Sequence, residues 1–561
     1  MPEYLAPAVY VEETSFRSKS IEGVSTSTTA FTGPTRKGPT IGTPELITSF
    51  GDFDRIYGGF SDLTFTGGRS LNFLAHAVKS YFDNGGSRLF VARIFRADGS
   101  TGVAASAFVG DDADDDNNLR FVSRTPGGVG NGIVTVSMAE STASVMAMTR
   151  APEGTLLVDG ADVFIKSGDT FLDDSDTAAG APGAGANFVT INVLVRDADG
   201  NENFYENMGF VAGHPRFIGD LLNTTPTRRI DQLENTFAIE PGTGVDGFRM
   251  HAILSAQATP IVLVAGNDGG EPTVASYVTP LDLLARNDDI SIVGAPGYSS
   301  YGARNAIQDA LITHVELRRA YRFAVLEVPQ NQTVTDALTT KSRIDSTYAA
   351  IYYPWIVTAN PLSQPGNESI PRELALPPTG FVCGIFARND VVKGVAKSPG
   401  NEIVRGALRY ETDVSFAEQE VLNPRGVNCL RFFPGRGYRL WGARTTSSDP
   451  EWKYVGPRRY FIYLEHSIDR STQWAVFENN GPQLWANIRE TVSGFLYNEW
   501  TNNSLLGANP EEAYFVRCDR TTMTQNDLDN GRLICLIGVA VLKPAEFVIF
   551  RIGQKTASSR D

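Results

Sequence analysis

The stretch Cys518–Gln554, CDRTTMTQNDLDNGRLICLIGVAVLKPAEFVIFRIGQ, decides how the chain is interpreted. It contains two nearly unbroken apolar runs, Leu533–Leu542 and Phe547–Ile552, which are rich in Ile, Val and Phe. Short runs bounded by Asp-Asn-Gly and by Lys-Pro are typical of β-strands. The first run carries apolar residues on both faces, which predicts a strand inside a sheet with cover on both sides.

The join between the two runs, Lys543-Pro544-Ala545, sets the direction of the second strand. It lacks the Asn-Gly or Gly-X pair that a tight hairpin favours. Pro544 also has a φ angle suited to extended chain. We therefore expect the second strand to continue outward, where it either docks in its own domain or adds to the sheet of a neighbouring molecule.

Another candidate strand, Ala8–Glu13 (AVYVEE), lies near the N-terminus. It follows Pro2 and Pro7 and precedes the Ser/Thr-rich stretch Gly23–Thr29. Its residues alone leave two interpretations open, an ordinary edge strand of its own domain or an arm that reaches another molecule.

The pattern becomes α/β from Thr40 to Arg96 and again after residue 260. Leu71–Phe82 has helical periodicity and ends at Asn84-Gly85-Gly86, a helix stop signal, before the apolar strand Leu89–Ile94. Pro260–Gly266 is interpreted as a buried strand that returns the chain to this pattern. Helices and strands then alternate as far as Ile356, which predicts helix-covered mixed sheets with some parallel strands.

Residues 98–245 have a different texture, because short alternating stretches are separated by Gly- and Asp-rich turns. This pattern predicts an inserted, mostly β domain. The segment holds 22 acidic and 8 basic residues, a net charge of −14, whereas the whole chain has −15. Such a distribution indicates a solvated, repulsive surface and argues against nucleic-acid binding, which needs a basic stripe.

The composition of the 561-residue chain is that of a globular protein with two to four domains. No apolar run is long enough for a transmembrane helix, and no basic segment followed by an apolar core marks a secretion signal. The four cysteines show no paired spacing and are interpreted as reduced, mostly buried thiols. We therefore expect synthesis in the cytoplasm.

Several patterns resemble catalytic or metal sites but lack an essential part. The five histidines have no metal-binding spacing. Asp111–Asp116 imitates a calcium loop without its Gly and Glu, and is interpreted as a solvated acidic loop. The glycine turn, which we define as Gly127–Gly132, lacks the Lys of a phosphate-binding loop. We therefore expect no enzyme, no cofactor and no metal; a carbohydrate-active surface enzyme is the alternative that stays open.

Four strings of the sequence resemble the contractile tail sheath family of myophages and phage-like injection systems. They are PAVYVEE and IEGVSTSTTAFTGPT near the N-terminus, WGARTTSSDPEWKYVGPRR after residue 440, and TTMTQNDLDNGRL with its following strands. The resemblance covers most of 7–97 and 250–554, and it is weak in the acidic segment. A baseplate or cap protein of the same machine is the alternative within this class.

The resemblance implies a subunit that polymerises as helical rings around an inner tube and contracts to drive that tube through a membrane. It implies contacts with other copies, the tube, the baseplate and a cap, but neither nucleic-acid binding nor membrane insertion. The expected domains are an N-terminal arm at 1–22, an α/β body at 23–97 and 246–427, an outward-facing insertion at 98–245, an inner domain at 428–542 and a C-terminal arm at 543–561.

The resemblance also implies which residues join subunits. The expected N-arm strand is Val9, Tyr10, Val11 and Glu12. The expected C-arm strand is Phe547, Val548, Ile549, Phe550, Arg551 and Ile552. The expected acceptor sheet contains Leu533, Ile534, Leu536, Ile537 and Val539.

Overall fold

A computed structural model describes residues 20–98, 104–110 and 115–551 of the chain. These residues form two compact units. The sheet unit contains 27–389 and 399–453, and the C-terminal unit contains the described parts of 1–26, 390–398 and 454–561.

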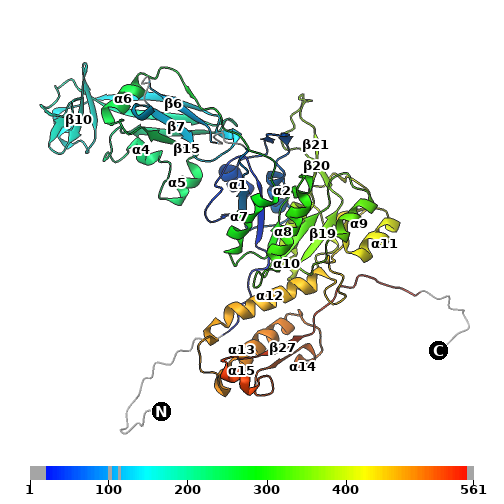
Figure 1. The fold of residues 1–561 in the computed structure, drawn as a ribbon. Coiled ribbons are helices and arrows are strands. Elements are labelled where there is room, and N and C mark those ends of the chain that lie inside the picture. Colours follow the sequence, from blue (N-terminus) through cyan, green and yellow to red (C-terminus); the bar gives the residue numbers. More distant parts are fainter. Residues whose placement is uncertain (1–19, 99–103, 111–114, 552–561) are drawn as a thin grey trace, which may run out of the picture. The chain divides into compact units, whose positions relative to one another are not determined.

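The sheet unit is built on a nine-stranded sheet in the order β2-β5-β1-β17-β18-β19-β24-β25-β22. Figure 1 shows this sheet with its strand β19 labelled. The six strands from β5 to β24 pair in parallel, and the strands at the two ends pair antiparallel. Their bounds are β1 Thr29–Pro34, β2 Glu45–Ile47, β5 Leu89–Ile94, β17 Ile292–Gly294, β18 Phe323–Glu327, β19 Ala349–Tyr353, β22 Glu402–Ile403, β24 Val427–Phe433 and β25 Gly437–Leu440.

Helices cover both faces of this sheet. One face packs against α7 Val274–Ala285, α8 Arg304–Glu316 and α9 Val334–Ser342, which share a core with alternate residues of the strands. On the other face, Phe31 contacts Tyr81 of α2 Phe73–Asp83, and Tyr352 contacts Phe386 of α10 Thr379–Lys393. Parallel strands buried on both sides are the arrangement that the alternating pattern predicted, so the α/β expectation is confirmed.

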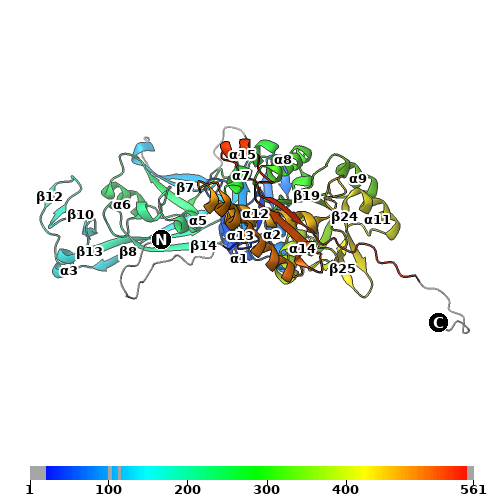
Figure 2. The ribbon, with the colours of Figure 1, turned by 90° about the horizontal axis from the view of Figure 1, so that it is seen from below.

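Residues 104–110 and 115–264 form a β-rich region with a core of its own. An eight-stranded sheet has the order β12-β11-β10-β9-β13-β8-β16, with β14 paired to β13, and a three-stranded sheet has the order β15-β7-β6. Figure 2 shows β8, β13 and β14 as long neighbouring strands. The bounds are β6 Ser106–Val109, β7 Leu119–Ser123, β8 Ile133–Thr142, β9 Leu156–Asp159, β10 Asp162–Ser167, β11 Thr170–Leu172, β12 Ala178–Ala179, β13 Asn187–Arg196, β14 Glu202–Met208, β15 Phe237–Pro241 and β16 Ile261–Val262.

The prediction that Pro260–Gly266 is a buried strand of the α/β body is wrong. Only Ile261–Val262 is a strand, and it pairs with β8 of the β-rich region. Val262 is 56% exposed, because β16 lies at the end of its sheet. The β-rich core therefore extends past residue 245 to Leu263 and includes α6 Gly247–Ser255.

Shorter elements complete the sheet unit. The strands are β3 Leu63–Phe65, β4 Gly68–Ser70, β20 Ile356–Ala359, β21 Glu373–Leu376 and β23 Arg409–Tyr410. The helices are α1 Phe50–Tyr57, α3 Val145–Arg150, α4 Ile218–Leu221, α5 Arg229–Glu234 and α11 Phe416–Leu422, with short 3₁₀ turns at Asp115–Asn117, Gly128–Gly130, Tyr298–Ser300 and Asn423–Arg425.

The C-terminal unit packs two long helices against a small antiparallel sheet. Its elements are α12 Val455–Ser471, a 3₁₀ turn Gln473–Ala475, α13 Pro482–Thr501, α14 Pro510–Ala513, β26 Tyr514–Arg517, α15 Gln525–Asp529 and β27 Leu536–Val539. The face of α13 that packs inward carries Trp485, Ile488, Val492 and Phe495, all buried. The buried pair Arg459–Asp390, with Nη2 and Oδ2 2.6 Å apart, fixes α12 within this unit.

The expected domain boundary at residue 428 differs from the structure. Val427–Cys429 of β24 pair in parallel with β19, so this strand belongs to the large sheet, and the C-terminal unit resumes at Tyr454. The strand would be equally apolar in either domain, so the sequence does not show to which domain it belongs. Only its pairing partner decides this.

Candidate functional site

The predicted acceptor strand is shorter and more exposed than the sequence suggested. Only Leu536–Val539 is a strand, and it pairs antiparallel with β26 in a two-stranded sheet. Leu536 is 50% exposed and Ile537 is 36% exposed, whereas Leu533, Ile534 and Val539 pack partly buried against the core of the unit. The expectation of cover on both faces is therefore wrong for this chain taken alone.

Among the described residues, one edge of strand β27 has no other strand paired with it. Within the described residues β27 pairs along its length with β26, and beyond its end Val541 makes a single bridge to Leu505. A strand at the edge of a small sheet presents backbone N–H and C=O groups to any extended segment of suitable length.

The C-terminal arm leaves this sheet as extended chain. Residues 540–551 contain no helix or strand, and Phe547, Val548, Ile549 and Phe550 are 70%, 69%, 79% and 84% exposed. Tyr454 donates a 3.0 Å hydrogen bond from its Oη to Glu546 Oε2, which holds the base of the arm. Ile552 and the predicted N-arm strand Val9–Glu12 lie outside the described residues.

Four consecutive exposed apolar side chains make this arm unusual for a surface. Single exposed apolar residues are ordinary, but a contiguous run marks a site of interaction. An extended backbone with apolar side chains on both faces has the chemistry of a strand that completes another sheet. The arm and β27 are therefore the candidate assembly site.

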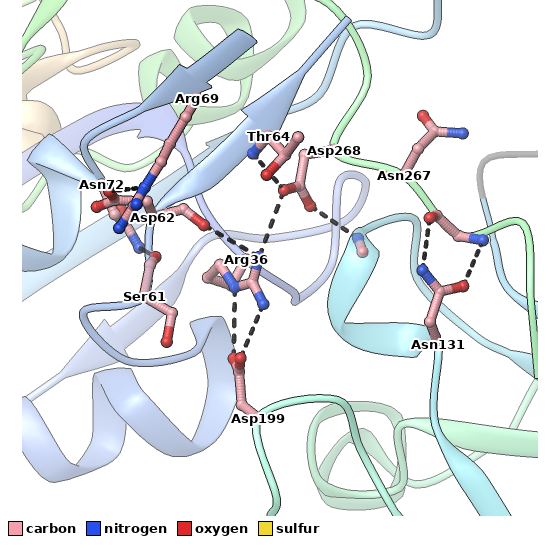
Figure 3. Close-up of polar contacts among 12 residues, drawn as sticks. Arg36, Ser61, Asp62, Thr64, Arg69, Asn72, Asn131, Asp199, Asn267 and Asp268 are labelled. Carbon is pink, nitrogen blue, oxygen red and sulfur yellow. Dashed lines mark hydrogen bonds and ion pairs between the residues drawn. The ribbon is translucent and has the colours of Figure 1, made fainter. Parts of the chain in front are cut away.

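The glycine turn, considered above as a phosphate site, binds a carboxylate of its own chain (Figure 3). Gly128 donates its backbone N–H to Asp268 Oδ1 at 2.7 Å, and Thr64 donates its N–H to Oδ2 at 2.8 Å. Asp268 is 6% exposed, so this anion fills the position that a free phosphate would need.

Arg36 joins the same cluster from the loop after β1. Its Nη1 lies 3.4 Å from Asp268 Oδ2 and its Nη2 lies 2.8 Å from Asp199 Oδ1, in the turn between β13 and β14 (Figure 3). Arg93 of β5 adds hydrogen bonds of 2.6 Å to the carbonyl of Gly38 and 2.7 Å to that of Pro126. The cluster ties the β-rich region to the large sheet, and sequence spacing gave no sign of it.

Glu327 is a buried carboxylate at the end of β18 that the sequence analysis also missed. Its Oε1 accepts from the N–H of Gly297 at 2.9 Å and from Ser299 Oγ at 2.9 Å, and its Oε2 accepts from Thr379 Oγ. Burial raises its pKa to about 7, although these hydrogen bonds lower it. All of these donors belong to the protein core, so the arrangement is a structural one.

Within 20–98, 104–110 and 115–551, no group of three or more His, Cys, Asp and Glu side chains is placed to hold a metal ion. No helix in the same residues is both long and apolar enough to span a membrane.

Two family descriptions match the C-terminal half of the sequence. Residues 270–446 match the phage tail sheath protein central domain, and 447–555 match the phage tail sheath C-terminal domain. Together these matches span just over half of the 561 residues and include β26, β27 and the described part of the arm.

This chain belongs to the phage tail sheath family.

Curated tail sheath relatives show distant similarity. A putative prophage major tail sheath protein of Pseudomonas aeruginosa (strain UCBPP-PA14) is 24% identical over 264 residues, which are 46% of this chain and 63% of that protein. The tail sheath protein of Vibrio phage KVP40 is 26% identical over 194 residues, 34% of this chain and 28% of that protein. The chain thus spans less than two thirds of the length of each of these relatives.

A solved sheath has the same fold over nearly the entire chain. The helical sheath of the anti-feeding prophage in its contracted state aligns with a TM-score of 0.56 and 18% identity, covering 99% of this chain and 100% of that one. At this identity the likeness concerns the tail sheath fold alone. It includes the mixed helices and sheets described above.

Proposed function

We propose that this chain is the structural subunit of a contractile tail sheath, which polymerises around an inner tube and contracts to drive the tube through a target membrane. The observation that carries the proposal is the exposed arm Phe547–Phe550 in a chain of the tail sheath family. Exposed strand edges and apolar arms are a liability for a monomer, but they join subunits in a polymer.

In this proposal the two ends of the chain link neighbouring copies. Val9–Glu12 adds to the sheet of one neighbour and Phe547–Ile552 to that of another, with Leu536 and Ile537 of β27 in the acceptor sheet. Repeated head-to-tail contacts that do not close produce a helical tube. Main-chain hydrogen bonds between arms and sheets let subunits rotate and slide without separating.

We also propose a position in this assembly for each of the domains expected above. The C-terminal unit and the arms line the inside against the tube, and the insertion at 98–245 faces outward. Its net charge of −14 discourages particles from bundling, because like charges repel across the solvent. The partners are other copies of the chain, the tube protein, the baseplate and a cap, within a phage or phage-tail-like particle.

Contraction needs no bound nucleotide in this mechanism. The free energy is stored during assembly, when subunits are held extended on the tube and baseplate, and is released when they repack into a wider array. The proposed subunit is therefore not an enzyme.

Negative-stain electron microscopy of the purified chain at high concentration tests the function directly. Hollow, striated tubes are the expected result. If only dispersed particles appear, the tube protein is added as a template; particles that still form no tubes would then contradict the sheath function. A chain lacking Phe547–Asp561 should remain a folded monomer that forms no tubes under either condition, and normal tubes from it would contradict the role of the arm.

A further inference from the structure

Two cysteines that are distant in the sequence face one another in the C-terminal unit. In the β26–β27 ladder Tyr514 pairs with Val539 and Arg517 with Leu536, so the next opposed pair is Cys518 and Cys535. Directly opposed residues of antiparallel strands have Cβ atoms about 4.5–5.5 Å apart. The two thiols lie close enough for each to affect the pKa of the other, and both are free.

The segment between the two cysteines is held in place by several contacts. Thr522 Oγ1 donates a 2.8 Å hydrogen bond to the carbonyl of Ile534, next to Cys535. Arg489 of α13 donates a 3.2 Å hydrogen bond to the carbonyl of Cys518. The side chains of both cysteines lie on the core side of the ladder, with Val516 and Val539. The backbone therefore keeps the sulfur atoms facing one another.

We propose that Cys518 and Cys535 form a redox-active pair that closes to a disulfide and fastens β27 to β26. A disulfide requires Cα atoms about 4.4–6.8 Å apart, and opposed strand residues satisfy this requirement without backbone movement. The remaining cysteines, Cys383 and Cys429, are buried in the sheet unit and belong to different elements, α10 and β24.

The reaction is a thiol–disulfide exchange with a low-molecular-weight disulfide as the oxidant. Cys535, partly exposed, loses its proton and attacks one sulfur of the oxidant, which releases one thiol and leaves a mixed disulfide. Cys518, which is buried, then attacks the Cys535 sulfur and releases the second thiol. Two protein thiols are oxidised, and the oxidant is reduced to two thiols that carry the protons.

The environment of the pair makes this exchange slow at neutral pH. Burial raises the pKa of the Cys535 thiol to about 12 and the neighbouring Cys518 adds to the effect, while Arg489 opposes it. Few thiolates exist at pH 7, so the pair stays reduced through brief exposure and closes during prolonged contact with an oxidant.

The disulfide would close the segment 518–535 immediately before the strand that leads into the C-terminal arm. A pull on the arm would then load a covalent bond as well as the four-residue ladder. This consequence rests on the proposed function, but the disulfide itself does not, because it forms within one chain.

The test uses the full chain in oxidised glutathione, followed by alkylation of free thiols and trypsin digestion without reduction. The expected product is a disulfide between the peptides Cys518–Arg520 and Leu533–Arg551, with two of the four thiols protected from alkylation. Its rate of formation should rise about tenfold from pH 7.5 to pH 8.5, because the thiolate fraction rises tenfold per pH unit below the pKa.

Matched variants separate this pair from the other cysteines. C535S should lose no thiol to the internal disulfide, while C383S should behave as the unmodified chain; oxidation should raise the thermal midpoint of the unmodified chain and leave that of C535S unchanged. Four thiols that remain free at equilibrium, or a disulfide through Cys383 or Cys429 or between chains, would overturn the proposal. Tube formation is scored separately, so a failure of the sheath function leaves this result readable.

Discussion

The buried carboxylate of Glu327 gives the sheet unit a predictable response to pH. Its pKa in the folded chain is raised to about 7 by burial, above the ordinary value of 4.5. The folded state therefore binds this proton more tightly than the unfolded state, and the associated stability is present at low pH and lost as pH rises from 4.5 to about 7. One pKa unit corresponds to about 1.4 kcal/mol, so the loss amounts to at most about 3.5 kcal/mol.

The variant E327Q should remove this dependence, because a neutral amide does not titrate. Urea unfolding of the full chain between pH 5 and pH 8 is expected to show a smaller decline of stability for E327Q than for the unmodified chain. E420Q is the control, since Glu420 is exposed. Equal declines in the unmodified chain and E327Q would show that Glu327 does not take up a proton in this range.

The two carboxylates that bind Arg36 should differ in their contribution to stability. Asp268 has a side chain that is 2% exposed and that accepts two backbone N–H groups, whereas the Asp199 side chain is 21% exposed. Removing one partner of a buried ion pair costs about 3–5 kcal/mol, while pairs near the solvent contribute up to about 1 kcal/mol.

We therefore expect D268N to lower the free energy of unfolding by several times as much as D199N. The amide that D268N introduces can accept hydrogen bonds at one oxygen only, so either a backbone N–H or Arg36 loses its acceptor. Chemical denaturation of both variants measures the difference. Similar losses of unfolding free energy in the two variants would show that the contact between the β-rich region and the large sheet depends on Arg93 and its carbonyl acceptors more than on this ion pair.

Among the elements, α10 shows how packing can reverse a helix propensity. Alanine in place of glycine usually stabilises a helix by roughly 0.5–1 kcal/mol. A Cβ atom at Gly384 of α10, however, would lie 2.4 Å from the backbone carbonyl oxygen of Tyr81 in α2. Overpacking of this kind costs about 1–3 kcal/mol, so the backbone contact decides the sign.

G384A is therefore expected to lower the thermal midpoint of the chain, in spite of the better propensity of alanine. G494A in α13 is the matched control, because a Cβ there meets no atom within 4 Å, and it should raise the midpoint slightly. A midpoint that rises in both variants would mean that α2 and α10 separate easily enough to admit the methyl group.

The elements also show which features the sequence could predict. Periodicity identified α2, because a helix buries one face of a single continuous segment. It failed for Ile261–Val262 and for β27, since the exposure of an apolar strand depends on which distant strand pairs with it. The pairing of Cys518 with Cys535 depends on strand register, and the hydrogen bond from the glycine turn to Asp268 depends on packing, so neither could be predicted from the sequence. The apolar arm could be predicted from the sequence because it has few contacts within its own chain, so its identification requires no distant pairing partner.

At the scale of the whole molecule, the candidate assembly site combines two incomplete structures. The strand β27 lies in a sheet of two strands, and the apolar arm 547–550 is extended, without a strand partner among the described residues of its own chain. The strand β27 supplies an unpaired backbone edge, and the arm supplies apolar side chains. A second copy of the chain supplies both in one repeating contact, which is how a single sequence can encode a lattice.

Proline substitution distinguishes strand addition from adhesion by apolar side chains. Proline has no backbone N–H and cannot donate to a β-ladder, so the double variant V548P/I549P should form no tubes, alone or with the tube protein. The control V548T/I549T keeps β-branched side chains and both N–H groups, and it should still polymerise. Because Val548 and Ile549 are 69% and 79% exposed, both variants should unfold at the temperature of the unmodified monomer. Normal tubes from the proline variant would show that the arm binds through its side chains and adds no strand to a neighbouring sheet.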